Sequence, residues 1–291
     1  MSDTPPFSTS KLWQAKIVSS VAFSLCVACS AFIIFLLALI TGYLGYIGFS
    51  SLSLDFFTKD PTGDVFNPGG MRHAILGTLV LLSMASLVAI PTGMAVGVYL
   101  SEYAERSWLA SVTRFVCDVL AGVPSIVVGV LGYELLVVPM GNFSAFAGSL
   151  ALAFIMVPIV ARTTEEMLRL VPNSYREASI ALGATKAVTI FKVVIPAATG
   201  PVITGIMLAL ARVAGETAPL LFTALGARLL SFNNFFSDPQ PFPSLTAQIY
   251  KYATGPYAAE KQLAWAGILV LIGLIFVINV LIRLVVARSK R

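Results

Sequence analysis

The sequence predicts an all-α integral membrane protein, because its composition and the length of its apolar runs both point to helices that cross a bilayer. Of the 291 residues, 57% are hydrophobic and only 11% are charged, whereas a soluble domain is normally about a quarter charged. Several apolar runs exceed the roughly 20 helical residues that cross a hydrocarbon layer about 30 Å thick. None shows the polar–apolar alternation of membrane β-strands. We therefore expect six transmembrane helices.

The expected spans follow one another closely along the chain. The first is too long, and lacks the small-residue cleavage site, for a removed signal peptide. We expect a cytoplasmic leader at 1–17, the first span with its outer loop at 18–72, a five-helix domain at 73–286 and a basic tail at 287–291. The six spans are expected at 18–40, 74–100, 119–140, 144–161, 198–225 and 263–286.

The distribution of basic residues predicts the orientation. Most of the 19 Lys and Arg residues fall on one side of the membrane if both termini lie on that side. Cytoplasmic loops carry the excess of positive charge, so we expect both termini in the cytoplasm. The net charge of +5 is explained by this bias and gives no support for binding to nucleic acid.

Few side chains could bind a metal. Cys26 and Cys29 form a C-x-x-C pair inside the first span, and Cys117 stands alone. In an apolar helix such cysteines are best interpreted as small hydrophobic residues. His73, the only histidine, is expected to be an interfacial polar residue at the outer end of the second span. We expect no metal site.

The segment Glu177–Pro196, "EASIALGATKAVTIFKVVIP", is a polar island between two apolar runs. Ser174 and Glu177 have the S-x-x-E spacing of a helix capping box, and Gly183 suits the left-handed position that ends a helix. A second short amphipathic helix is expected from Lys186, and Pro196 is expected to break it before the fifth span.

Helices this short are marginal alone in water, so another surface must cover their apolar face. One interpretation is a helix that lies on lipid. The other is a helix that docks in a groove of a cytoplasmic partner, for which the small residues Ala178, Ser179 and Ala181 allow close approach.

The same segment resembles the EAA motif of ABC importer permeases, in which E-A-A is followed by three residues, Gly, nine residues and I-x-L-P. Here Ser179 replaces the second alanine and Val-Val-Ile-Pro ends the motif, with the spacing intact. The resemblance implies the type I ABC importer permease fold and a cytoplasmic coupling helix within a loop at 163–197. The expected ATPase-coupling residues are Ser174, Glu177, Ala178, Ser179, Gly183, Ala184 and Pro196.

Three further stretches resemble the A-type permease subunit of Pst phosphate importers: "AGVPSIVVG" at 121–129, "ARVAGETAPLLFTA" at 211–224, and the segment 242–272. The resemblance implies a bacterial inner-membrane subunit that translocates phosphate. Its implied partners are a homologous C-type permease subunit, two ATPase subunits, an extracytoplasmic phosphate-binding protein and membrane lipid. The outer loop at 226–262 is expected to be an ordered cap on the side where that protein docks.

Catalysis is not expected of this chain. It contains no G-x-x-x-x-G-K-[ST] motif to cradle nucleotide phosphates. We therefore expect no bound cofactor and no enzymatic activity, with ATP and Mg used by the partner ATPase.

Charged residues inside the spans indicate a substrate path. Arg212 and Glu216 lie four residues apart in the expected fifth span, on one helical face, and Glu134 lies in the third. Ionisable groups at membrane depth usually face a bundle interior or a water-filled path, and an arginine fork suits phosphate oxygens. Ser125 and Thr217 complete the expected path, and Pro124, Gly215 and Pro219 are expected to loosen the helices beside it. A structural ion pair between Arg212 and Glu216 is the alternative.

A different class of function is a self-contained secondary transporter or channel for an anion. Such transporters often contain inverted repeats with paired broken helices. No second R-x-x-G-E occurs in the N-terminal half, and this alternative leaves the polar island unexplained.

Overall fold

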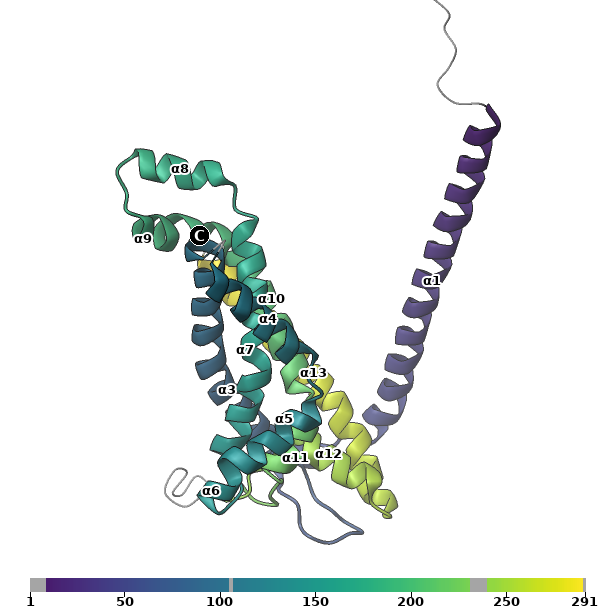
Figure 1. Ribbon diagram of the computed structural model, residues 1–291. Helices are drawn as coiled ribbons and strands as arrows, with labels where there is room; N and C mark the ends of the chain where they lie inside the picture. Colours follow the sequence, from purple (N-terminus) through teal and green to yellow (C-terminus); the bar gives the residue numbers. More distant parts are fainter. Residues whose placement is uncertain (1–8, 105–106, 231–239, 290–291) are drawn as a thin grey trace, which may run out of the picture. The chain divides into compact units, whose positions relative to one another are not determined.

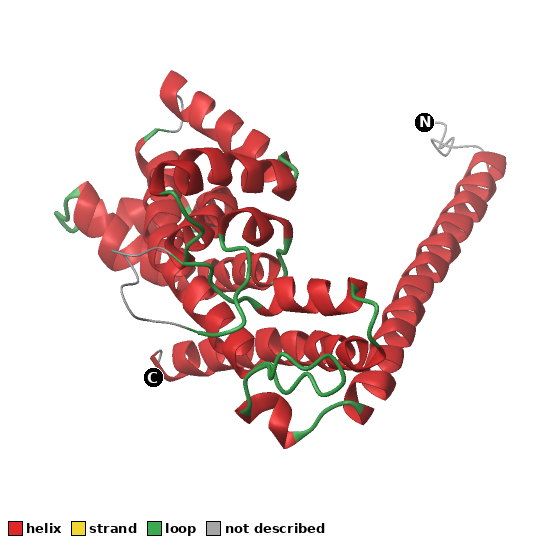
Figure 2. Cartoon of the chain, turned by 90° about the horizontal axis from the view of Figure 1, so that it is seen from below, coloured by secondary structure: helices red, strands yellow, loops and turns green. Residues whose placement is uncertain are grey.

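The computed structural model describes residues 9–104, 107–230 and 240–289. Within these ranges the chain is helical, and its only β pairings are two isolated bridges, Pro61 with Gly69 and Leu225 with Phe242 (Figure 2). The chain divides into two compact units, Met1–Ser50 and Ser51–Arg291. The all-helical expectation is confirmed.

The first unit contains one helix, α1, which runs over Thr9–Ser50. The expected span 18–40 lies inside it. Residues 9–17, expected in the leader, belong to the same helix, and residues 1–8 of the leader lie outside the described residues. The side chains of Cys26 and Cys29 are exposed on this helix.

The second unit contains the remaining described helices (Figure 1). Three short π-helical turns occur among the described residues: η1 ends the helix that starts with α3, while η2 and η3 lie within longer helices. Its first half comprises α2 (Leu54–Thr58), α3 (Arg72–Val98), η1 (Tyr99–Tyr103), α4 (Trp108–Gly122), α5 (Ser125–Gly132), η2 (Tyr133–Val137), α6 (Val138–Met140) and α7 (Ala145–Arg169). Its second half comprises α8 (Asn173–Ala181), α9 (Lys186–Thr189), η3 (Ile190–Val194), α10 (Ile195–Ala214), α11 (Ala218–Thr223), α12 (Leu245–Thr254) and α13 (Ala258–Ser289).

Among the described residues, 5 helices are long and apolar enough to cross a membrane, and the number rises to 6 if a bent pair counts as one span. That pair consists of Trp108–Gly122 and Ser125–Met140, which meet at an angle of 101°. The third span, expected at 119–140, therefore begins earlier, at Trp108, and is bent between Gly122 and Ser125. Pro124 directly precedes α5 and has no amide hydrogen to continue the helix.

The fifth span also differs from the prediction of 198–225. Its helix is continuous from Lys186 to Ala214, and Gly215 ends it. After Glu216 and Thr217 the chain turns into the separate helix α11. The helix therefore begins before residue 198 and ends before residue 225, so both expected boundaries are wrong. Pro124 and Gly215 lie at helix ends, as expected, whereas Pro219 lies in the first turn of α11, where a proline loosens no helix.

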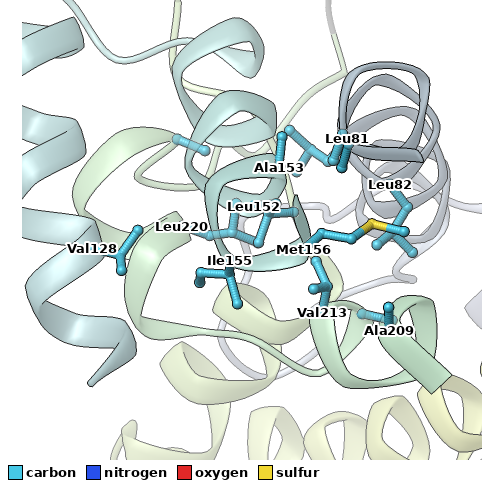
Figure 3. Packing of buried hydrophobic residues seen from close by; sticks show 14 of the residues in the cluster. Leu81, Leu82, Val128, Leu152, Ala153, Ile155, Met156, Ala209, Val213 and Leu220 are labelled. Carbon is cyan, nitrogen blue, oxygen red and sulfur yellow. The ribbon is translucent and has the colours of Figure 1, made fainter. Parts of the chain in front are cut away.

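The largest hydrophobic core lies among α3, α5, α7, α10 and α11. Met156 of α7 packs with Leu82 of α3 and Val213 of α10 (Figure 3). The packing of α3 on α7 depends on two glycines of α3: a Cβ on Gly93 would lie 2.8 Å from the Cβ of Val160, and one on Gly97 only 2.6 Å from the Cβ of Thr164. This G-x-x-x-G spacing lets helices approach closely.

A second hydrophobic cluster lies where α2 and the start of α3 pack against α12 and α13. Phe56 of α2 and Met71, before α3, are buried with Leu245 and Ile249 of α12 and Ala264 of α13. In the described part of the outer loop, α12 is thus an ordered and largely buried helix; residues 231–239 of that loop, including Pro239, lie outside the described residues. Figure 1 shows α8 and α9 at one end of the unit, with α6, α11 and α12 at the other.

His73 lies in the first turn of α3, at the end of the second span, and its side chain is buried within the protein. Its side chain is 1% exposed, and neither ring nitrogen has a hydrogen-bond partner among the described residues. The preceding loop folds over the start of α3, because the amide of Met71 donates to the Phe56 carbonyl at 2.9 Å and Arg72 donates to the Asp60 carboxylate at 2.7 Å.

Candidate functional site

The polar island forms the short helix α8, which starts differently from the expected capping box. Pro172 is the N-cap, with φ −59° and ψ 143°, and no side chain caps the helix. Ser174 therefore lies inside the first turn, where it cannot cap, and the predicted Ser174–Glu177 capping box is wrong. Proline fixes φ near −65° and so sets the chain direction at this turn. The side chain of Glu177 is exposed.

The end of α8 confirms the prediction for Gly183. This glycine has φ +82°, the left-handed region that glycine enters without steric cost. Its amide donates to the Ile180 carbonyl at 2.9 Å, and the next amide, of Ala184, donates to the Ser179 carbonyl at 3.2 Å. These two bonds are those of the Schellman motif, which satisfies the free carbonyls of a helix end.

The chain then enters a second helix without the break that we expected at Pro196. The Thr185 hydroxyl accepts from the Val188 amide at the start of α9, and the helix continues through η3 into α10. Pro196 lies in the first turn of α10, directly after a π-helical turn that shifts the hydrogen-bond register. The missing amide of a proline is tolerated there.

The two short helices hold together through a hydroxyl pair. Ser179, at the third position of the EAA motif, lies with its Oγ 2.9 Å from Oγ1 of Thr189, which is itself buried. Here the departure from alanine in the motif provides a hydrogen bond.

This loop exposes several apolar side chains that no described part of the chain covers. Leu182, directly before Gly183, is 90% exposed, and α8 buries none of its residues. The other large exposed apolar side chains on these helices are Tyr175, Ile180, Val188 and Phe191. Ala178 is exposed and Ala184 half-buried. We use the term coupling face for Tyr175, Ala178 and Leu182, which lie at three- and four-residue spacing on one side of α8.

A buried carboxylate lies deeper in the same end of the unit. Glu165 of α7 is 1% exposed and forms ion pairs with Arg114 at 2.6 Å, Arg162 at 2.7 Å and Arg169 at 2.7 Å. Burying a charge is costly unless it is paired. Arg114 ties α4 to this carboxylate of α7, while Arg162 and Arg169 pair with it within α7. Sequence reasoning missed this cluster, although Glu165 is spaced at three and four residues from two of the arginines.

The predicted Arg212–Glu216 pair is absent from the structure. Arg212 lies in the last turn of α10, whereas Glu216 lies beyond the C-cap residue Gly215 and outside the helix. The two therefore do not share a helical face, and that part of the prediction is wrong. Arg212 is exposed, and among the described residues no ion pair joins it to Glu216 or to any other carboxylate.

The remaining residues of the predicted path divide into two groups. Ser125 begins α5 and Thr217 precedes α11, and these helices pack together, because a Cβ on Gly129 would lie 3.0 Å from the Cα of Pro219. Glu134, in η2, is exposed, and the described residues provide it with no ion pair.

A contact that the sequence did not predict links the third stretch to the second. The Thr246 hydroxyl of α12 donates to the Glu216 carbonyl at 3.1 Å. The stretches 121–129, 211–224 and 242–272 thus meet around the break between α10 and α11. No periodic pattern in the sequence indicates Thr246; only its place in one of the three stretches could have singled it out.

Comparison with known proteins identifies the family. Residues 89–291 match the model of the binding-protein-dependent transport system inner membrane component family. The phosphate transport system permease protein PstA of Yersinia pestis is 44% identical over 82% of this chain and 80% of its own length. The corresponding protein of Xylella fastidiosa is 44% identical over 82% of each chain.

Solved structures support the fold. A chain of the MetNI methionine ABC transporter in an inward-facing conformation has a TM-score of 0.60 and 21% identity, covering 76% of this chain and 98% of its own. At this identity the likeness concerns the fold alone. From the family match and the identity to the PstA permeases, the chain belongs to the binding-protein-dependent transport system inner membrane components, a family of multi-pass permeases.

Proposed function

We propose that the chain is the A-type permease subunit of an ATP-driven phosphate importer in a bacterial inner membrane. The observation that carries this proposal is the identity of 44% to proteins named phosphate transport system permease protein PstA, along 82% of this chain. The partners are a homologous C-type permease subunit, two ATPase subunits and an extracytoplasmic phosphate-binding protein. Both termini face the cytoplasm, and lipid surrounds the spans.

The coupling face is the surface to which an ATPase subunit binds. It is apolar and exposed, and it lies on a short helix whose end is fixed by Gly183. A cytoplasmic protein with an apolar groove suits this face, because an amphipathic helix buries its apolar residues in such a groove. ATP and Mg are held by that partner, and this chain holds no cofactor.

Arg212 is the cation of the proposed phosphate path. It is exposed in the last turn of α10, beside the break where the three stretches meet, and no carboxylate of the described residues pairs with it. An exposed guanidinium without a carboxylate partner is available to the oxygens of a phosphate.

We assign Ser125 and Thr217 to the same region of the path. A site in a translocation path must bind weakly enough to release, and the exposure of Arg212 suits weak binding. Glu216, which forms no ion pair with Arg212, is a further residue of the path to be tested. Glu134 is exposed on η2. We assign it to the outer part of the path, to be tested together with the other path residues.

The test is labelled-phosphate uptake in cells that lack other phosphate importers, combined with purification of the chain to ask whether an ATPase subunit comes with it. We expect uptake that requires the ATPase genes, and co-purification of the ATPase. Leu182→Asp changes only an exposed side chain, so it should leave the membrane level of the chain normal while the ATPase no longer co-purifies.

Two outcomes would contradict the proposal. Phosphate uptake by the chain without any ATPase would favour a secondary transporter or channel. If Leu182→Asp binds the ATPase normally, the ATPase does not bind at the coupling face. That result would favour contact of α8 with lipid.

A further inference from the structure

The turn η1, at the end of α3, contacts both α8 and α9, the two short helices between α7 and α10. It covers Tyr99–Tyr103 and consists of π-helix, a rare conformation that often occurs at functional sites. Glu102 and Tyr103 are neighbours within it. Each of them contacts a cation from a different helix of the loop, Arg176 of α8 and Lys186 of α9.

The contact with Arg176 is a bidentate ion pair. Nη2 of Arg176 lies 2.6 Å from Oε1 of Glu102, and Nε lies 3.1 Å from Oε2. Both side chains are inside the protein, with 19% of Arg176 and 5% of Glu102 exposed. The planar guanidinium matches the two carboxylate oxygens, which gives such a pair a fixed geometry.

Arg176 also fixes the turn between α7 and α8. Its Nη1 donates to the Val171 carbonyl at 2.6 Å, and its Nη2 donates to the Leu168 carbonyl at 3.0 Å. The Ser101 hydroxyl donates to Oε1 of Glu102 at 3.1 Å. One guanidinium therefore joins the end of α7, the end of α3 and the first turns of α8.

The same turn is tied to the rest of the unit. Nζ of Lys186 lies 4.9 Å from the centre of the Tyr103 ring, a cation–π contact. Arg114 of α4 donates to the Leu100 carbonyl of η1 at 2.9 Å and pairs with the buried Glu165 of α7 at 2.6 Å. Displacement of α8 or α9 is thus transmitted by direct contacts to α3, α4 and α7.

Hydrophobic packing holds α8 only weakly, because none of its residues is fully buried. Its side-chain attachments are the contacts of Arg176 and the Ser179–Thr189 hydroxyl pair. If the charge pair is removed, the apolar coupling face remains intact but its direction relative to α3 is no longer fixed. Attachment to a partner and transmission to the membrane helices are therefore separable properties of this loop.

We propose that Arg176 and Glu102 are positioning residues that convert movement of the ATPase-bound coupling face into movement of α3 and α7. This inference rests on the proposed function, since it assumes that an ATPase binds the coupling face. It assigns to Arg176 and Glu102 a role that neither the motif nor the exposed surface assigns to them.

The test compares Arg176→Gln, Glu102→Gln and the double variant in the purified complex, with ATP hydrolysis and phosphate uptake measured in proteoliposomes. We expect each single variant to reach normal membrane levels, to co-purify with the ATPase and to hydrolyse ATP, while phosphate imported per ATP falls at least tenfold. The double variant should be no worse than the worse single variant, because both substitutions remove one shared interaction.

Two further variants separate positioning from a general structural role. Arg176→Lys should restore part of the uptake, since an ammonium keeps the charge but not the fork. Lys192→Gln, an equal loss of charge from the same loop at an exposed residue with no ion pair among the described residues, should import phosphate normally.

The proposal is overturned if either single variant loses its ATPase or its membrane level, if both single variants couple normally, or if their effects multiply in the double variant. Failure of the proposed function is distinguishable, because it would appear in the wild-type chain as transport without an ATPase.

Discussion

Arg176 of α8 and Arg212 of α10 differ in burial and in the partners of their guanidinium groups. Arg176 is mostly buried and its guanidinium is bound by a carboxylate and two carbonyls. Arg212 is exposed, and the described residues provide no carboxylate partner for it. A fully satisfied arginine fixes the positions of helices, whereas an unsatisfied arginine remains available to a ligand.

The two ends of the second unit also differ in the interactions that stabilise them. The end that includes α8 is stabilised by ion pairs, with Glu102 and Glu165 each buried against arginine. The end that includes α5 and α11 is stabilised by close backbone approach at Gly129 and Gly132. The bidentate ion pair of Arg176 and Glu102 holds the first end at a defined point, whereas the glycine contacts set how closely the helices of the second end approach.

Removing the unsatisfied arginine should have the largest effect. Arg212→Ala is expected to lower phosphate uptake at least about tenfold, since a hydrogen bond to a charged group contributes about 1.5–3 kcal/mol and each 1.4 kcal/mol is roughly tenfold in rate. Assembly and ATP binding should be unchanged, because Arg212 holds no helix. Labelled-phosphate uptake is the measurement, with Arg212→Lys as the charge-preserving control. Wild-type uptake by Arg212→Ala would remove this residue from the path.

The glycine contact at the opposite end should be sensitive to one methyl group. In Gly129→Ala the new Cβ would lie 3.0 Å from the Cα of Pro219 and 3.2 Å from the Ala218 carbonyl, and such overpacking typically costs about 1–3 kcal/mol. We expect a lower melting temperature of the solubilised protein. Gly122→Ala is the matched control, since nothing lies within 4 Å of its added Cβ. Equal melting temperatures for the two variants would contradict the account of this packing.

The end of α8 should respond to backbone conformation rather than to space. Gly183 has φ +82° and open space around its added Cβ, so Gly183→Val strains only the backbone, by about 1–2 kcal/mol. Association with the ATPase should weaken severalfold in a pull-down titration. Gly183→Asn, which tolerates the left-handed region, should bind almost normally. If the valine and asparagine variants bind equally well, the helix end does not set the docking angle.

The smallest effect is expected on the loop that covers His73. The hydrogen bond from Arg72 holds the pKa of Asp60 below its usual value, so the ionised form is stabilised on folding. This stabilisation is present above the unfolded pKa, near 4, and is lost as the pH falls through the lower folded pKa. Because the pair is partly exposed, Asp60→Asn should cost less than about 1 kcal/mol. Thermal melting at pH 7 and pH 3 should differ less in this variant than in the wild-type protein.

The helices and the family motif could be predicted from the sequence because hydrophobic length and motif spacing are local properties. The left-handed Gly183 and the breaks at Pro124 and Gly215 followed from the backbone chemistry of these residues. The start of α8 was mispredicted because Pro172 and the long-range contacts of Arg176 override the local capping signal of Ser174. The Arg212–Glu216 pair failed for a similar reason, since a helix that ends at Gly215 cannot present both residues on one face. Thr246 and Glu102 act through partners distant in sequence, which no periodicity indicates.

The central claim is that transport by this chain is driven by a separate ATPase through the coupling face. It is tested most directly by labelled-phosphate uptake into proteoliposomes that contain the chain, its partner permease and the ATPase, with the binding protein supplied on the extracytoplasmic side. The account predicts uptake only when ATP and the ATPase are both present, and no uptake when Leu182→Asp replaces the wild-type chain. Uptake driven by a phosphate gradient alone, at the same rate with and without the ATPase, would contradict it.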